Sequence, residues 1–459
     1  MKRDKRAVAS DRLSAPGDAA ADLAERLSAA EETVAKYRQL TADYPGRYRS
    51  ELANALTDLS FALMLKQDRP AESADAGQEA LAIRVELTTA NPDLARTGVG
   101  FAGLPRPIGP LAEEAAEKAA AEKGESAARP LPYRTDLAVG LSNLGLRLFH
   151  LDRAGDALPF AQAAVTAYRT LAAADPDRFR SNLAGSLSNL CITLAEMGRP
   201  AEALPAIEEA VATYRELAAA DPDPDQYRPG IAKSLHALAA RLAELSRTDD
   251  ALGAEREAVA AYRELAAASP DRYRPGLARA LHSLGIWLAE RGLHADAVPV
   301  DQEAAGAYRK LAAADPARYW PDLAAVLSNL SGELGELGRH AQALMAADES
   351  VSMYKKLARA DAATYSPALA SALTNLSIAY VGVGRASDAI GSSREGVTVY
   401  RRLAAASPGY YDTALADSLD NLAHCLNIEA LNQSIGGRAG KARKLREEAA
   451  KIRVSIDRS

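Results

Sequence analysis

Two pairs of basic and histidine residues occupy equivalent places 46 residues apart in the chain. The first pair is Lys233 and His236, and the second is Arg279 and His282. Lysine and arginine form charge-assisted hydrogen bonds with carboxylates. Histidine takes up and releases protons near neutral pH. The four residues therefore predict a site for an acidic partner or, as an alternative, an acid–base site in which a nearby glutamate is the partner of the histidines.

A row of asparagines follows the same register, one place after the histidines: Asn143, Asn189, Asn329, Asn375 and Asn421. An amide carries a donor and an acceptor together. These two groups favour hydrogen bonds to the backbone of an extended peptide, without recognition of its side chains. Two other interpretations stay open. The amides can bond to the adjacent repeat, and a nearby stripe of glutamates can neutralise the basic residues: Glu196, Glu244, Glu290 and Glu336.

The register itself comes from a Leu-Ser-Asn-Leu phrase that begins at Leu141 and returns at Leu187 and Leu327. Variants of the phrase fill the same slot at Leu56, Leu235, Leu281, Leu373 and Leu419. From Leu141 onward the period is 46 residues, with one step of 48. A fixed period of about 20 to 50 residues is typical of a solenoid of stacked repeats.

Each repeat has the pattern of two helices. With Leu183 and its equivalents counted as place 0, leucines at places 4, 7 and 11 form one stripe of an α-helix, except that place 11 is Tyr380 in one repeat. Place 8 is always small. A Gly-Arg turn follows in several repeats, at Gly198, Gly338 and Gly384. A second helix then runs to a Tyr-Arg pair and stops near a proline, which cannot continue a helix. A tyrosine or phenylalanine after the proline is expected to cap a loop between repeats.

The string Asn189, Leu190, Cys191, Leu194, Gly198, Ala203, Leu204 and Ala210 resembles the helix-turn-helix signature of the tetratricopeptide repeat family. The resemblance implies an all-α solenoid of αα-hairpins, wound as a superhelix whose concave surface is lined by the first helix of each repeat. It also implies a protein or peptide partner. Carboxylate-binding members of the family use Lys, Asn and Arg on these faces. The usual unit of about 34 residues is shorter than this one, so the chain resembles a long-helix variant.

Eight helix pairs after one unpaired N-terminal helix are expected. We predict a disordered basic tail at residues 1–18 and the N-terminal helix with the first repeat at 19–93. The central array follows at 132–427, and a capping helix with a tail at 428–459. Residues 94–131 interrupt the array, and Phe101, Leu104 and Ile108 suggest a lid across the groove. A tolerated surface insertion is the alternative.

Composition narrows the class of protein. The net charge is −6 and the pI is about 5.7, which argues against general nucleic-acid binding. We find no apolar run long enough for a membrane span and no secretory signal after the basic N-terminus. Cys191 and Cys425 are expected to be reduced packing residues. We expect a cytoplasmic protein without metal or cofactor. Arginine far outnumbers lysine and alanine is abundant, which suggests a bacterial source.

These patterns favour a scaffold or adaptor that holds a protein or peptide, acidic in one reading, in its groove. The sequence has no catalytic triad, metal-ligand spacing or phosphate-binding loop, so an enzyme is the less favoured interpretation. Three alternatives remain: catalysis at the Lys, His and Arg cluster, small-molecule binding there, and self-assembly. A homodimer through the terminal helices is conceivable because Leu23 and Leu27 form an apolar edge on the unpaired first helix.

Overall fold

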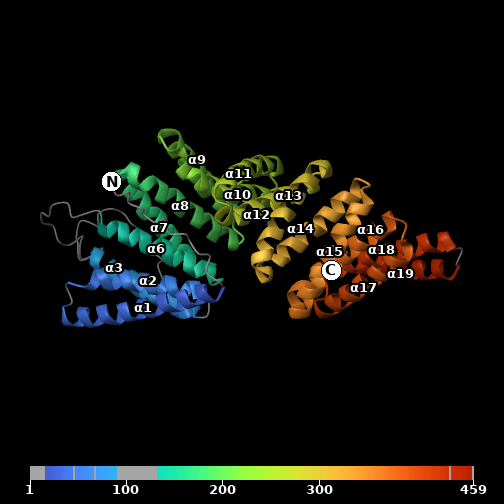
Figure 1. Cartoon of the computed structure of the whole chain (residues 1–459), viewed down its shortest axis with the longest axis horizontal. Helices are drawn as coiled ribbons and strands as arrows, with labels where there is room; N and C mark the ends of the chain where they lie inside the picture. The colour runs from blue at the N-terminus through green and yellow to red at the C-terminus, as the bar shows by residue number, and fades with distance from the viewer. Residues whose placement is uncertain (1–15, 45–46, 67–68, 90–131, 434–435, 457–459) are drawn as a thin grey trace, which may run out of the picture. The chain divides into compact units, whose positions relative to one another are not determined.

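A computed structural model describes residues 16–44, 47–66, 69–89, 132–433 and 436–456. Within them the chain forms seventeen α-helices and one short 3-10 helix, η1 (Figure 1). After the unpaired first helix, the other helices follow in eight consecutive pairs along the sequence, which confirms the all-α repeat fold. Phe101, Leu104 and Ile108, together with the whole 94–131 segment, lie outside the described residues.

The chain divides into two compact units, Met1–Ser246 and Arg247–Ser459. The first unit contains α1 (Pro16–Asp43), α2 (Arg49–Lys66), α3 (Pro70–Thr89), α6 (Pro132–His150), α7 (Ala154–Ala174), α8 (Pro176–Glu196), α9 (Pro200–Ala220), η1 (Pro224–Tyr227) and α10 (Arg228–Glu244). The second unit contains α11 (Thr248–Ala268), α12 (Pro270–Glu290), α13 (His294–Ala314), α14 (Pro316–Glu336), α15 (His340–Ala360), α16 (Ala362–Gly382), α17 (Ala386–Ala406), α18 (Asp412–Gln433) and α19 (Gly436–Ile456).

The leucine stripe and the small residue at place 8 form the core of each repeat. Leu187 is 1% exposed, and Leu190 is half-buried against the same cluster. At place 8, Cys191 is completely buried and carries a free thiol. A Cβ on Gly145 would lie 3.3 Å from the backbone nitrogen of Ala161. The second helix therefore approaches so closely that only a small side chain fits between the two backbones.

The turns between paired helices follow the predicted glycine pattern. Gly198, Gly338 and Gly384 have φ angles of 67°, 68° and 76°, which lie in the left-handed region that glycine adopts without strain. The arginine that follows often bonds to an acid three residues later in the first turn of the second helix. Arg199 Nε, for example, donates to Glu202 Oε1 over 2.7 Å. Burial of the leucine stripe and these turns together set the helical hairpin.

The junctions between repeats differ from the sequence-based expectation. Proline begins the next helix, at Pro176, Pro270 and Pro316, and only one residue separates the two helices. Asp175 is one such linker, and its side chain accepts a hydrogen bond from the backbone nitrogen of Arg178. Phe179 therefore lies inside the first turn of α8 and not in a loop. Proline is tolerated there because the first N–H groups of a helix have no partner within it.

Ion pairs connect the second helices of neighbouring repeats. A basic residue late in one helix meets a glutamate 40 residues further on, as in Arg169–Glu209, Arg263–Glu303, Arg309–Glu349 and Lys355–Glu395. In the last repeat the partner of Arg401 is Glu448, 47 residues away. The last repeat therefore contains seven additional residues before its second helix. Residues of α19 correspond to those of the other second helices once these seven residues are subtracted.

Leu27 of the predicted apolar edge is buried, whereas the side chain of Leu23 lies outside the described residues. Leu27 is 5% exposed and packs with Ala62 and Leu63 of α2, while Val34 joins the core beneath α2 and α3. The expectation that Leu27 is available for dimerisation is therefore wrong, because α2 already covers it. Among the described helices, none combines the length and apolar character needed to cross a membrane.

Candidate functional site

Three residues of the predicted site line one hollow in the first unit. Asn143 on α6, Asn189 on α8 and Lys233 on α10 border a cavity of about 470 Å³. We call it the first-unit hollow, and its other polar lining residues include Ser142, Ser181, Asn182 and Ser186. The residues come from the first helices of three successive repeats. Asn143 and Asn189 occupy equivalent places 46 residues apart, whereas Lys233 occupies a different place in its repeat. The lining offers hydroxyls, amides and one ammonium group.

The asparagine amides also hold neighbouring repeats together. Asn189 Nδ2 donates to Ser142 Oγ over 3.5 Å, and Asn375 Nδ2 donates to Ser328 Oγ over 3.1 Å. Asn421 Nδ2 bonds to Ser377 Oγ over 2.6 Å and to Ser393 Oγ over 3.1 Å. In α10 an alanine replaces the asparagine. Ser234 there meets the hydroxyl of Ser188 instead, with 3.0 Å between the oxygens.

These contacts support the interpretation that the row connects repeats. The bonds use the amide N–H groups, and among the described residues no donor reaches the Oδ1 atoms of Asn189 or Asn375. Asn143 makes no side-chain hydrogen bond within the described part of the chain. The row therefore keeps amide oxygens as acceptors, and Asn143 keeps both kinds of group.

A second hollow lies on the equivalent face of the second unit. Asn329 and Asn375 line a cavity of about 330 Å³ between α12, α14 and α16. Its border also contains Glu290, Glu336 and His294. This second-unit hollow is acidic, whereas the first-unit hollow contains a lysine. An acidic partner is therefore compatible with the first hollow and repelled by the second.

His282 does not act as a cationic group. Burial lowers the pKa of His282 to about 4, so the ring is neutral at neutral pH. Its Nε2 lies 3.3 Å from Asn329 Nδ2. Because an amide nitrogen only donates, Nε2 accepts, and the ring proton resides on Nδ1. His282 thus takes the role that serine has in neighbouring repeats, which corrects the expectation of a potentially cationic residue.

The predicted basic cluster is divided between the two units. Lys233 and His236 belong to the first unit, and Arg279 and His282 to the second. Arg279 is exposed on α12. Its positive charge opposes the rise that burial causes in the pKa of Asp322. Whether the four residues form one binding site stays a prediction.

A buried pair of carboxyls escaped the sequence analysis. Asp301 on α13 is fully buried and Glu333 on α14 is 3% exposed. Burial is the main cause that raises the pKa of both, and the proximity of Glu333 raises that of Asp301 further. No donor in the described residues bonds their four oxygens. Among the described residues the two carboxyls interact only with each other, so one must hold a proton to bond the other.

The sequence does mark Asp301 as unusual when equivalent places of the repeats are compared. Asp301 stands where other repeats have Ala76, Ala161, Ile207, Ala347 or Ser393. Only Glu255, one repeat earlier, is also acidic there. The acid fits because the facing residue is Gly285, where an added Cβ would lie 2.0 Å from Asp301 Oδ1. The pattern of polar and apolar residues within one repeat does not identify Asp301 as buried. Comparison of the equivalent place in all repeats would have identified it.

Comparisons with known proteins found one family match and several similar solved structures. A family model described as tetratricopeptide repeat matches residues 183–223. No curated protein matches the chain. Among solved structures, aspartyl phosphate phosphatase F from Bacillus subtilis is 14% identical, with a TM-score of 0.46 and 94% of each chain covered.

A signal transduction ATPase with numerous domains from Pyrococcus horikoshii, described as having a tetratricopeptide repeat sensor, is 13% identical. Its TM-score is also 0.46, and the match covers 88% of this chain and 53% of that one. Residues 183–223 therefore match the tetratricopeptide repeat, and the 46-residue register repeats the same pair of helices along the described chain.

Proposed function

We propose that the chain is a scaffold that binds a polypeptide partner along the first helices of its repeats. The observation that carries this proposal is the first-unit hollow, in which three successive repeats contribute Asn143, Asn189 and Lys233 to one cavity. A ligand that spans this cavity contacts polar side chains from three successive first helices. An extended peptide has the matching property, because its backbone groups also repeat.

The chemistry of the lining suits a peptide backbone. Backbone N–H groups need acceptors, and the Oδ1 atoms of Asn143 and Asn189 provide them. Backbone carbonyls need donors, which the N–H group of Asn143 and nearby serine hydroxyls supply. Lys233 is exposed at the α10 side of the cavity and favours a carboxylate. We infer that the bound segment has an acidic residue or a C-terminal carboxylate near Lys233.

The proposal is tested with a peptide selected for binding. A random peptide library is screened against the whole chain, and the affinity of the best binder is measured by fluorescence anisotropy. Asn143→Ala and Lys233→Glu should each weaken binding about tenfold, the size expected for loss of one good polar contact. Asn143 is chosen because its side chain makes no hydrogen bond to any described residue, so its removal leaves the described contacts between repeats in place.

Two controls make the result specific. Lys310→Glu changes the same charge at an exposed place on the second helix α13 and should leave affinity within about twofold. Circular dichroism checks that each variant keeps its helices. A peptide that binds both first-unit variants as tightly as the wild type would show that this face is not the binding surface.

A further inference from the structure

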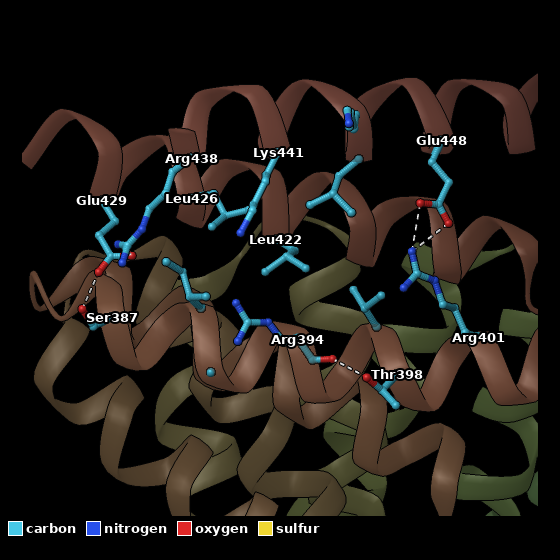
Figure 2. A pocket seen from close by; sticks show the side chains of 15 residues that line it. Ser387, Arg394, Thr398, Arg401, Leu422, Leu426, Glu429, Arg438, Lys441 and Glu448 are labelled. Atoms are coloured by element: carbon cyan, nitrogen blue, oxygen red, sulfur yellow. Dashed lines mark hydrogen bonds and ion pairs between the residues drawn. The ribbon is translucent and has the colours of Figure 1, made fainter. Parts of the chain in front are cut away.

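The last two repeats border a cavity that is separate from the two hollows. It lies between α17 and α19, with α18 as its floor, and has a volume of about 900 Å³ (Figure 2). We call it the C-terminal pit. Its size is within the range of about 300 to 1,000 Å³ that small-molecule sites occupy. None of its lining residues belongs to the two hollows described above.

Polar bridges close the two ends of the pit. At one end Ser387 Oγ on α17 donates to Glu429 Oε1 on α18 over 2.5 Å, and Arg438 on α19 pairs with the same glutamate. At the other end Arg401 Nη2 on α17 donates to both oxygens of Glu448 on α19, over 2.8 and 2.9 Å (Figure 2). The bridges limit the length of the cavity. A compact ligand therefore fits better than a chain that runs through it.

The floor and lower walls are apolar. Leu422 and Leu426 of α18 face the cavity, one helical turn apart (Figure 2). Ile390 and Val397 of α17 and Leu445 of α19 complete the apolar lining. Gly391 widens it, because no atom lies within 4 Å of the place where its Cβ would be. This surface can bury an apolar group that is released from water.

The walls above this floor are positively charged. The lining contains five cations, Arg394, Arg401, Arg438, Lys441 and Lys444, and two acids, Glu429 and Glu448. Both acids are already paired, with Arg438 and Arg401. Within the described residues, no ion pair or side-chain hydrogen bond holds Arg394, Lys441 or Lys444. Figure 2 shows Arg394 and Lys441 on opposite walls between the two bridges.

A reversal of charge in the repeat pattern produces this arrangement. In earlier repeats the arginine at the start of the second helix pairs with an acid three residues later, as in Arg199–Glu202 and Arg385–Asp388. With the shift of the last repeat, Arg438 takes the place of that arginine, and Lys441 stands where the acid would be. Arg438 pairs with Glu429 instead. Lys441 is left facing the pit.

We propose that the C-terminal pit binds a compact amphiphile: an apolar chain or ring whose anionic group is a carboxylate or a phosphate. The apolar part packs on Leu422 and Leu426, and the anion lies between Arg394 of one wall and Lys441 of the other. Arg394, Lys441 and Lys444, which have no side-chain partner among the described residues, select the sign of the headgroup, because a cationic headgroup would be repelled by them.

Four ligands with the same eight-carbon chain test the sign of the headgroup. Binding of octanoate, octyl phosphate, 1-octanol and octyltrimethylammonium to the whole chain is measured by isothermal titration calorimetry. Both anions should bind at least about tenfold more tightly than 1-octanol, and the cation more weakly than 1-octanol. The ratio of the two anions distinguishes a carboxylate site from a phosphate site. Anions that bind no more tightly than 1-octanol would overturn the proposal.

Variants locate the site. Lys441→Glu should weaken binding of the preferred anion at least about tenfold, while Lys451→Glu, an exposed place on the same helix, should change it less than about twofold. Gly391→Leu fills the pit without a change of charge and improves helix propensity, so it should block binding and keep the fold. Equal binding by Lys441→Glu and Lys451→Glu, or unchanged binding by Gly391→Leu, would contradict the proposal. Gly391→Leu should not change the affinity of the peptide selected for the proposed function. The peptide site and the amphiphile site can therefore be disproved independently.

Discussion

Place 4 of each repeat is a buried leucine. Leu187 is 1% exposed and lies in the cluster that joins α6 to α9. Leu190, three residues later, contacts the same cluster but is half-buried. The period of 3.6 residues brings both to one face, yet the neighbouring helix covers them unequally.

Leu187→Ala should lower the free energy of unfolding by about 2 to 5 kcal/mol, because it removes buried methyl groups and leaves a cavity. Leu190→Ala should cost less, since part of its surface already faces water. Chemical denaturation followed by circular dichroism measures both. A larger loss for Leu190→Ala than for Leu187→Ala would mean that the helix faces are assigned incorrectly.

The buried carboxyls of Asp301 and Glu333 make stability depend on pH. Their pKa values are raised in the folded chain, while in the unfolded chain such groups ionise near about pH 4. Above about pH 4 the folded state therefore binds more protons than the unfolded state. Stability must then fall as the pH rises toward the folded pKa values.

Asp301→Asn should reduce this loss, because an amide donates a hydrogen bond to Glu333 and carries no charge. The melting temperature is measured from pH 5 to pH 9 for the wild type, Asp301→Asn and Asp296→Asn. Asp296 is exposed on the same helix and serves as the control. Parallel pH curves for all three proteins would show that the carboxyl pair does not control the pH response.

At the scale of helices, the distance between α12 and α13 depends on a single missing methyl group. Gly285 faces Asp301, and a Cβ there would overlap the carboxyl. Gly253 on α11 is also inside a helix but has open space at its Cβ position. Gly285 therefore allows the close approach of α13, whereas packing does not require a glycine in place of a larger residue at Gly253.

Gly285→Ala should destabilise the chain by about 1 to 3 kcal/mol through overpacking. In the background of Asp301→Ala the same substitution should cost much less, since the overlapping carboxyl is gone. Gly253→Ala should stabilise by about 0.5 to 1 kcal/mol, because alanine is the better helix former. The free energy of unfolding is measured for the wild type, Gly285→Ala, Asp301→Ala and the double variant, with Gly253→Ala as the control. Equal costs of Gly285→Ala in both backgrounds would exclude the proposed overlap.

At the scale of the whole chain, stability is divided among neighbouring contacts, as in other repeat proteins. The two helices that flank the 94–131 segment show this clearly. Leu81 of α3 shares a buried cluster with Leu137 and Leu141 of α6. The first and second repeats are thus packed on each other by described residues alone.

Deletion of residues 94–131 should therefore leave a folded array. Circular dichroism and thermal unfolding compare the deletion variant with the wild type, and its melting temperature should stay within a few degrees. Collapse of the helical signal would show that the segment is part of the core and neither a lid nor a tolerated insertion.

The repeat register, the helix pairs, the core leucines and the turn glycines were all predictable from the sequence. Gly198 and Leu187 are identified by spacing, because one helical period governs both the pattern and the burial. The ends of the helices were harder to predict. Pro176 ends one helix in the sequence pattern but begins the next in the structure, since proline is compatible with both roles.

The chemistry of the individual side chains depended on neighbours that are distant in sequence. His282 reads as a basic residue until burial and Asn329 make it a neutral acceptor. Asp301 reads as a surface acid until α14 brings Glu333 against it. Lys441 reads as part of a charged cap until a seven-residue shift places it across the C-terminal pit from Arg394. Periodicity is a local property of the chain, whereas charge, protonation and cavity shape arise only when separate helices meet.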